Sequence, residues 1–439
     1  MNALLLSIIG PMFAAVLCLF FRHSLKAQRL IAGIATHAVA AASWWVFLLT
    51  LNSGPQVLRL GHWPDAYGIV LAVDLFGALL IATASLTQIA TYWFIVSGGA
   101  KIDHERTLLH PFLLLLTCGV NWAFSTGDLF NLFVSFEILL ISSYVLLVHG
   151  GTAPQLREGF KFVVLNLLAS TLFLIAAGFS YGLFGSLNMA ELAVRLAQFN
   201  YPKSALLLGT LFLLVFCAKA ATFPLYFWLP DAYPKAPPGI LAYFGGVLTK
   251  VGVYCLYRVF TLVFRDPEMW ANWFQPLLMG IAITTMFVGV MGAYGQVTMR
   301  RILCFHIVSQ IGYMILGLAL FTPVAIACGI FYIVHNMIVK SALLMVADAV
   351  LINEGTDKLK KLDGLMVTAP LMAFLFLLAA LSLAGIPPFS GFYGKFGFVL
   401  EALRSSNFLA AFFALLTGLF TLASMVKICL LYTSPSPRD

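Results

Sequence analysis

The stretch SALLLGTLFLLVFCAKAATFPLYFWL, residues 204–229, decides the fold that this sequence predicts. It is apolar over a length that can span a bilayer, and Lys219 is its one charge. An ammonium near mid-membrane costs roughly 3 kcal/mol on insertion scales, so a lysine kept there indicates function. Pro224 follows and cannot donate to the carbonyl of Ala220, which predicts a helix break beside the lysine.

A second stretch combines the same features. The sequence LSLAGIPPFSGFYGKFGF, residues 381–398, contains Pro387, Pro388 and Lys395. Broken helices with charges at bilayer depth are typical of ion-translocating membrane proteins. The two stretches together predict that the chain moves ions across a membrane.

Composition indicates an all-α polytopic membrane protein. The chain has 439 residues, of which 62% are hydrophobic and 10% charged, and its mean hydropathy is +0.98. A soluble domain of this size could not bury so much apolar surface. We predict about thirteen transmembrane helices, with cores near residues 3–21, 30–51, 68–97, 108–126, 129–148, 160–184, 204–229, 239–263, 273–294, 302–321, 324–351, 367–394 and 407–431.

No linker composition interrupts these runs, so residues 1–430 are predicted to form one integral-membrane domain. The first run lacks a cleavage-site pattern, which favours a retained helix over a signal peptide. Residues 431–439 form a polar, proline-containing tail unlike the rest of the chain. It is either a short disordered terminus or foreign sequence attached to an incomplete chain, and we favour the second interpretation.

Several classes of function are excluded by residue usage. The seven cysteines occur singly in apolar runs without a Cys/His cluster, which argues against iron–sulfur, zinc and disulfide roles and predicts no cofactor in this chain. No cluster of oxygen ligands marks a metal or sodium site. The formal charge of +8 is explained by loop lysines and arginines that set topology, so nucleic-acid binding is excluded.

The distribution of lysine and arginine predicts an N-terminus outside the cell in a multi-pass inner (plasma) membrane protein. The odd-numbered loops carry the larger set, namely Arg22, Lys26, Arg29, Lys101, Arg106, Arg157, Lys161, Lys235, Arg300, Arg301, Lys358, Lys360 and Lys361. The even-numbered loops carry only Arg59, Arg195, Lys203, Arg258, Arg265 and Arg404.

Glu137 is the one charge in LFNLFVSFEILLISSYVLLV, residues 129–148. We expect it to pair with Lys219, because lone opposite charges at similar depth stabilise each other. Desolvation disfavours an ammonium and an approaching carboxylate favours it, so movement of Glu137 could switch Lys219 between holding and releasing a proton. A static ion pair between two helices is the other interpretation.

Further ionisable residues extend this set along the chain. Lys250 lies too deep in its run for easy escape to the surface, and Lys395 is expected at one end of an ion path. His335 and Lys340 share one run, where their spacing places them on different faces of a regular helix. His306 is either part of the path or a packing histidine.

The segments at residues 126–151, 158–193, 218–258, 301–314, 335–350 and 384–396 resemble the antiporter-like subunits shared by respiratory complex I and Mrp-type cation/proton antiporters. The similarity covers almost the whole chain. Within that superfamily, LLISSYVLLVHGG, LNMAELA and YFWLPDAYPKAPP are most similar to the family of D-type subunits of Mrp Na⁺/H⁺ antiporters.

The resemblance implies fourteen helices, two inverted five-helix repeats, and broken helices at Pro224 and at Pro387–Pro388. It implies that Glu137 and Lys219 match a paired glutamate and lysine, Lys250 a connecting lysine and Lys395 a terminal lysine. His335 and Lys340 match polar residues of the long helix between the repeats, and Asn336 stands where a second histidine is often found.

Three interpretations follow. The leading one is a membrane subunit of a multi-subunit antiporter, not an enzyme, that exchanges protons for Na⁺ beside other membrane subunits in the lipid bilayer. The second is a proton-pumping membrane subunit of a complex I-like NADH–quinone oxidoreductase or membrane-bound hydrogenase. The third is a structural membrane scaffold, which the buried charges disfavour.

Overall fold

The computed structural model describes residues 2–61, 63–64, 68–97, 103, 108–198, 202–362 and 365–433. Lys101, Arg106 and residues 434–439 of the predicted tail lie outside this set. The chain divides into two compact units, which are described separately. Unit 1 comprises Met1–Ala220 and Val247–Phe274, and unit 2 comprises Ala221–Gly246 and Gln275–Asp439.

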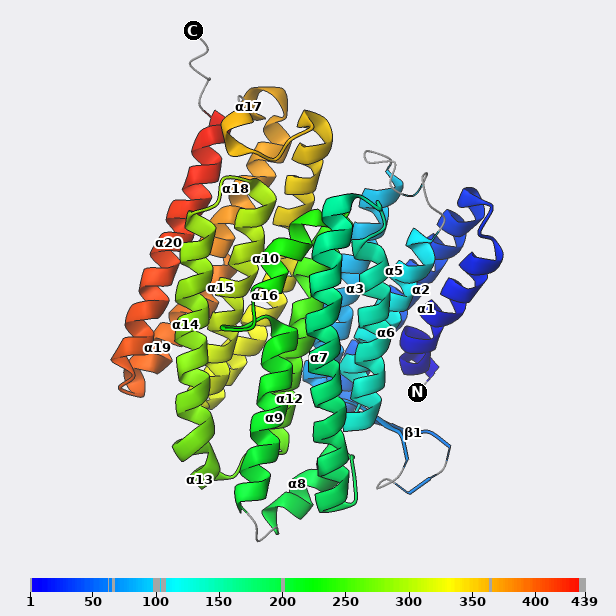
Figure 1. The fold of residues 1–439 in the computed structure, drawn as a ribbon, viewed down its shortest axis with the longest axis vertical. Helices are drawn as coiled ribbons and strands as arrows, with labels where there is room; N and C mark the ends of the chain where they lie inside the picture. Colours follow the sequence, from blue (N-terminus) through cyan, green and yellow to red (C-terminus); the bar gives the residue numbers. More distant parts are fainter. Residues whose placement is uncertain are drawn as a thin grey trace. The chain divides into compact units, whose positions relative to one another are not determined.

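Unit 1 is a helical bundle with one small hairpin (Figure 1). Helix α1 packs on α2 and α5. Along the chain, α5 then packs on α6, α6 on α7, α7 on α9 and α9 on α12. The strands β1 (Gln56–Arg59) and β2 (Val70–Val73) pair antiparallel. The helices are α1 (Asn2–Phe20), α2 (Leu25–Ser53), α3 (Leu75–Val96), α5 (Leu109–Ser125), α6 (Leu129–Leu147), α7 (Ala153–Phe184), α8 (Met189–Ala197), α9 (Pro202–Ala220), α12 (Thr249–Leu262), α13 (Pro267–Met269) and the π turn η3 (Trp270–Phe274).

Unit 2 is built mainly of long helices, with α15 packed between α14 and α16. Helix α16 also contacts α18 and α19, and α20 closes against α14, α18 and α19. The elements are α10 (Trp228–Ala232), η1 (Tyr233–Lys235), α11 (Ile240–Tyr243), α14 (Gln275–Tyr294), α15 (Met299–Leu320), α16 (Pro323–Glu354), η4 (Leu359–Lys361), α17 (Leu365–Thr368), α18 (Pro370–Ala384), α19 (Ser390–Arg404) and α20 (Phe408–Thr433). The π turn η2 (Phe244–Leu248) joins α11 to α12.

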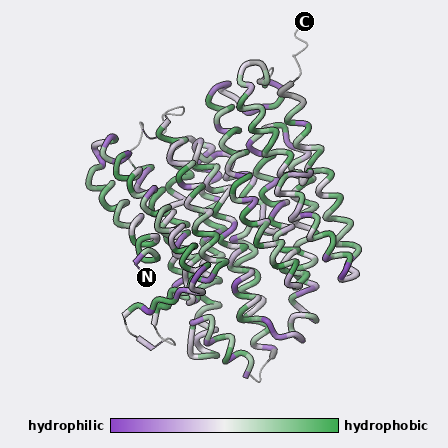
Figure 2. Tube along the Cα trace, turned by 180° about the vertical axis from the view of Figure 1, so that it is seen from behind, coloured by the Kyte–Doolittle hydropathy of each residue, from purple (hydrophilic) through white to green (hydrophobic). Residues whose placement is uncertain are grey.

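The all-α polytopic prediction is confirmed. In the described part of the chain, eleven helices are long and apolar enough to cross a membrane, and two shorter apolar helices, Leu109–Ser125 and Pro370–Ala384, complete the predicted set. Hydrophobic residues cover most of the helical length, with hydrophilic ones at turns and at a few positions inside helices (Figure 2).

Three predicted runs differ from the observed elements. Run 68–97 begins with strand β2 before α3 starts at Leu75, and β1 was not predicted. Run 204–229 is helical only to Ala220, and run 367–394 divides into α18 and α19. Each helix break falls at a predicted proline segment, where the ladder of backbone hydrogen bonds cannot continue.

Helices α7 and α16 show that the two units repeat a common pattern. Both are 32 residues long and both begin after a threonine N-cap, Thr152 or Thr322. Both end at a glycine, Gly185 or Gly355, whose backbone is in the left-handed region. Residues with a side chain adopt that conformation less readily than glycine does. This recurrence agrees with the predicted pair of repeats.

The ion pair between Asp74 and Arg258 joins two helices of unit 1. Asp74 caps α3 by accepting from the backbone amide of Gly77, and its oxygens lie 2.6 and 2.7 Å from the Arg258 guanidinium on α12. Arg258 also donates to the Tyr254 hydroxyl, which donates to the Phe124 carbonyl on α5. This network holds α3, α5 and α12 together and explains why charges remain at these positions.

A second polar cluster joins Arg29 of α2, Asp103 and His110 of α5. Arg29 donates to both carboxylate oxygens of Asp103, at 2.7 and 2.8 Å, and His110 contacts the same carboxylate at 3.2 Å. The Asp103 side chain is fully buried. Burial by itself raises the pKa of Asp103, but hydrogen bonds and charges from His110 and Arg29 outweigh it and hold that pKa below its ordinary value.

Replacement of Asp103 by Asn should therefore destabilise the protein in a pH-dependent way. A carboxylate with a lowered pKa contributes stability above its unfolded pKa of about 3.9, and this contribution is lost as the pH falls through the lower folded pKa. We expect Asp103→Asn to cost roughly 2 kcal/mol at pH 7 and clearly less below pH 4. Thermal unfolding of the purified protein in detergent measures both values.

The matched control for that experiment is Asp266→Asn, because Asp266 is an exposed carboxylate that caps α13 through the amide of Met269. This variant should change little at either pH, since asparagine also caps helices well. An Asp103→Asn penalty that stays constant across the pH range would contradict the proposed role of the carboxylate charge.

Candidate functional site

Lys219 lies in the last turn of α9 and is 5% exposed. Its Nζ donates to the Ser170 hydroxyl at 2.8 Å and to the Asn166 carbonyl at 3.1 Å. Both acceptors belong to one turn of α7, and the Phe136 ring lies 5.6 Å from Nζ. An ammonium in an apolar span thus receives defined acceptors from a neighbouring helix, as a buried charge requires.

The position of Lys219 follows from the helix break beside it. Helix α9 ends at Ala220, Ala221 has φ +61°, and the next helix begins only at Trp228. The last carbonyls of a helix have no intrahelical partner and carry the negative end of its dipole. A lysine in that turn is therefore electrostatically favoured where an apolar environment would otherwise exclude it.

Glu137 lies on α6, close enough to attract Lys219 electrostatically. Within the described residues, no ion pair of 4.0 Å or less joins the two side chains, and the Glu137 Oε1 atom is buried without a hydrogen-bond partner. The predicted pair is therefore brought into one neighbourhood but not into contact, because Lys219 donates to α7 instead. Its functional role remains a prediction.

Lys250 is fully buried near the start of α12, directly after the π turn η2. Gly252, one residue beyond Val251, allows α12 to approach the end of α9 closely. A Cβ at Gly252 would lie 2.6 Å from the Ala220 nitrogen and 2.9 Å from the Lys219 carbonyl carbon. The backbones that carry Lys219 and Lys250 thus touch, and π turns recur at functional positions of this kind.

In unit 2, α16 carries His335 and Lys340, which point to different neighbours. His335 Nδ1 lies 2.8 Å from the Ser390 hydroxyl on α19, whereas Lys340 Nζ donates to the Leu303 carbonyl on α15 at 3.4 Å. Helix α16 is continuous over this region, so the two residues occupy different faces as the spacing predicts. Asn336 donates to the Tyr332 carbonyl.

Lys395 lies on α19 and reaches across the break to the end of α18. Its Nζ donates to the carbonyls of Leu383 and Ala384 at 2.9 and 3.0 Å, and the Tyr313 ring lies 4.9 Å away. These carbonyls are free because α18 stops at Ala384 and α19 starts only at Ser390, after Pro387 and Pro388. The break thus provides the acceptors for the lysine.

His306 is buried on α15 and contacts the Ser424 hydroxyl of α20 through Nε2. Its Nδ1 has no hydrogen-bond partner among the described residues. The contact with α20 fits the packing interpretation, and a role in an ion path remains a prediction.

The acceptors around these lysines and His335 were missed by the sequence analysis. They are short polar side chains and main-chain carbonyls, namely Asn166, Ser170, Leu303, Ser382, Leu383, Ala384 and Ser390. Ser170, a polar side chain in a largely apolar run, is the signal that could have indicated one of them. Backbone carbonyls carry no such signal.

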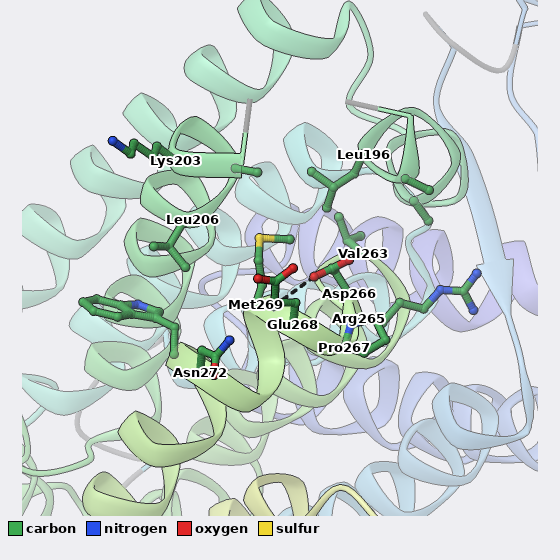
Figure 3. A pocket seen from close by; sticks show the side chains of 14 residues that line it. Leu196, Lys203, Leu206, Val263, Arg265, Asp266, Pro267, Glu268, Met269 and Asn272 are labelled. Carbon is green, nitrogen blue, oxygen red and sulfur yellow. Dashed lines mark hydrogen bonds between the residues drawn. The ribbon is translucent and has the colours of Figure 1, made fainter. Parts of the chain in front are cut away.

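Other features of the described residues do not extend this site. They contain no group of three or more His, Cys, Asp or Glu side chains that could hold a metal ion. A cavity of about 730 Å³ lies in unit 1 between α8, the start of α9 and α13, lined by Lys203, Arg265, Asp266, Glu268 and Trp273 among others (Figure 3). None of the candidate residues lines it.

The chain is similar to known membrane proteins over nearly its whole length. Residues 126–421 match the family described as "NADH:quinone oxidoreductase/Mrp antiporter, TM". The D-type Na⁺/H⁺ antiporter subunit of Alkalihalophilus pseudofirmus is 43% identical over 428 residues, which cover 97% of this chain and 86% of that protein. The protein of the same name from Bacillus subtilis is 38% identical over 429 residues, with the same coverage.

The chain is also similar to solved structures of membrane complexes. A chain of the Mrp complex from a Dietzia species has a TM-score of 0.92 and 34% identity, covering 100% of this chain and 82% of that one. A chain of an archaeal membrane-bound sulfane sulfur reductase has a TM-score of 0.92 and 26% identity, covering 98% and 87%. A chain of respiratory complex I from Thermus thermophilus shares the fold. It has a TM-score of 0.86 and 24% identity, covering 100% of this chain and 90% of that one.

The geometry at Lys395 predicts the effect of Gly385→Ala. Gly385 has φ +88°, and a Cβ there would lie 2.8 Å from Lys395 Cδ. We expect this variant to lose roughly 2 kcal/mol, from a strained backbone and from displacement of the lysine, with a lower Tm. Gly355→Ala is the control for strain alone, because Gly355 also lies in the left-handed helical region, at φ +68°, with open space around it. Equal losses in both variants would show that the contact with Lys395 is unimportant.

Proposed function

Because the chain belongs to the family of NADH:quinone oxidoreductase/Mrp antiporter transmembrane proteins, we propose that it is the D-type membrane subunit of a multi-subunit antiporter that exchanges protons for Na⁺. The similarity to two proteins named as D-type Na⁺/H⁺ antiporter subunits supports this proposal. The observation that carries it is the buried Lys219, held at a helix end by α7 with the carboxylate of Glu137 nearby.

The hydrogen bonds of Lys219 are suited to a change of protonation. A neutral amine has two N–H donors and an ammonium has three. The two acceptors on α7, Asn166 and Ser170, satisfy the neutral form completely. The third N–H of the ammonium needs a further acceptor or a nearby negative charge, and Glu137 supplies that charge. The site can therefore hold either form, and the position of Glu137 selects between them.

We propose that the remaining candidate residues continue the proton path, with Lys250 in unit 1 and His335, Lys340 and Lys395 in unit 2. Each of these side chains is buried, as expected for groups that carry protons out of contact with bulk water. Lys395 resembles Lys219 in that both lie at a helix break and donate twice. Pro224, Pro387 and Pro388 maintain these breaks in the proposal.

The second candidate is a proton-pumping subunit of a redox-driven complex. The similarity to the sulfane sulfur reductase chain favours it, and the same buried residues would serve such a pump. Its identity of 26% is lower than the 43% and 38% of the antiporter relatives, so we favour the antiporter. Exchange that runs on an ion gradient alone, without an electron donor, separates the two candidates.

We also propose that the chain works beside other membrane subunits in the inner (plasma) membrane, with its N-terminus outside. Large apolar side chains on α7 and α20 face outward, including Phe160, Phe179, Leu409 and Leu419. Such faces suit packing against lipid or against other transmembrane helices. The predicted bias of loop lysines and arginines supports the orientation.

The replacement of Lys219 by Ala tests the proposed function. We expect Lys219→Ala to reduce Na⁺-driven proton movement more than tenfold in membrane vesicles that contain the assembled complex, because Lys219 is the group that takes the proton at that break in the proposal. A pH-sensitive dye reports the movement after Na⁺ is added. Lys203→Ala, which removes an exposed lysine at the start of the same helix, should retain activity. Full exchange by Lys219→Ala at normal protein levels would refute the proposal.

Reconstitution tests the dependence on partners. We expect proteoliposomes with this chain alone to show no Na⁺-driven pH change, and proteoliposomes with the complete complex to show one. The reason is that the candidate residues are buried and need a route to water on both sides, which neighbouring subunits would complete. A robust response from the single chain would mean that it is a self-contained antiporter.

A further inference from the structure

We infer that Ser390 and Ser382 position His335 so that Nε2 is the ring nitrogen that exchanges the proton. This inference rests on the proposed function, because it assigns an atom-level role within that proton path. Ser390 is the first residue of α19 and Ser382 lies in the last turn of α18, so the two hydroxyls bridge the break between these helices.

The first argument is the hydrogen bonding of the imidazole. His335 is 4% exposed, its Nδ1 lies 2.8 Å from Ser390 Oγ, and Ser390 Oγ lies 3.2 Å from Ser382 Oγ. The Nε2 atom is buried without a hydrogen-bond partner in the part of the chain that the structure describes. One nitrogen is thus engaged and the other is available.

The second argument is the chemistry of a hydroxyl beside a histidine. A serine hydroxyl can accept from an N–H or, after rotation, donate to a bare ring nitrogen. When Ser390 Oγ donates to Ser382 Oγ, it accepts from Nδ1–H, and this bond is the same in the neutral Nδ1–H tautomer and in the protonated ring. Because Nδ1 then keeps its proton, Nε2 is the atom that gains and loses one.

The third argument is that the ring itself is held in place. The Tyr332 ring stacks on His335 with centroids 5.2 Å apart and planes at 25°, and the Tyr332 hydroxyl donates to the Gln310 side chain. Gly391, the second residue of α19, also brings its backbone close to the ring. A Cβ there would lie 3.1 Å from His335 Cε1 and 1.8 Å from the Ser382 carbonyl oxygen.

The same turn of α18 also holds Lys395. Ser382 contacts Ser390, and the next two residues, Leu383 and Ala384, accept from Lys395 Nζ. Three consecutive residues at the break therefore position two groups of the proposed path. The charged or titratable groups that act on His335 are Lys340 on its own helix, Lys395 on α19 and the stacked Tyr332.

The test is exchange by the assembled complex with Ser390→Ala, measured per amount of complex in vesicles over a range of pH. Loss of one hydrogen bond that orients a proton carrier should lower the rate about fivefold to tenfold, and it should shift the pH profile because both ring nitrogens are then open to protonation. Ser390→Thr keeps a hydroxyl at the same place and should restore both the rate and the profile. Ser382→Ala removes only the second hydroxyl and should show a smaller change in the same direction.

Ser405→Ala, at the exposed end of α19, is the matched control and should behave as the unmodified protein. If Lys219→Ala abolishes exchange while Ser390→Ala and Ser382→Ala keep an unchanged pH profile per amount of complex, this inference is wrong and the proposed function stands. If Lys219→Ala retains full exchange, the proposed function itself fails. If Ser390→Ala does not assemble, the profile of Ser382→Ala decides, and an unchanged profile overturns the inference.

Discussion

The requirement that a buried ammonium be surrounded by acceptors governs the arrangement of this protein. Lysines inside apolar spans cannot be left unsatisfied, since an isolated charge in a low-dielectric interior is prohibitively costly. Lys219 and Lys395 meet this requirement with acceptors that match an amine in number, two for each Nζ. Lys395 takes both acceptors from carbonyls at the end of α18, whereas Lys219 takes the Ser170 hydroxyl and the Asn166 carbonyl from one turn of α7. The break between α18 and α19 is therefore part of the charge chemistry of Lys395.

Close backbone approach is a second feature of the helices that carry the candidate residues. Glycines make this possible at Gly252 against the end of α9 and at Gly391 against α18. The same glycines set the positions of Lys250 and His335, so packing and chemistry depend on the same few residues.

The sequence predicted the main features of the fold because they depend on composition along single segments. Apolar length predicted the spans, and proline predicted the ends of α9 and α18. The hairpin β1–β2 was missed because β2 is apolar and continuous with α3, so length alone could not separate a strand from a helix. The charged residues were identified because a lone charge in an apolar run is conspicuous. Their acceptors were not, because the Leu383 and Ala384 carbonyls belong to residues of no distinctive type and become acceptors only when the chain folds.

Helices α7 and α16 have one further consequence. Counted from the first residue of each helix, Asn166 and Asn336 occupy the same position, and so do Ser170 and Lys340. The backbone pattern recurs, yet the place that accepts from a lysine in unit 1 is itself a lysine in unit 2. At this shared position, unit 1 therefore has a hydroxyl that accepts a hydrogen bond, and unit 2 has an amine that donates one. A duplicated scaffold can in this way lose its chemical symmetry through one side chain.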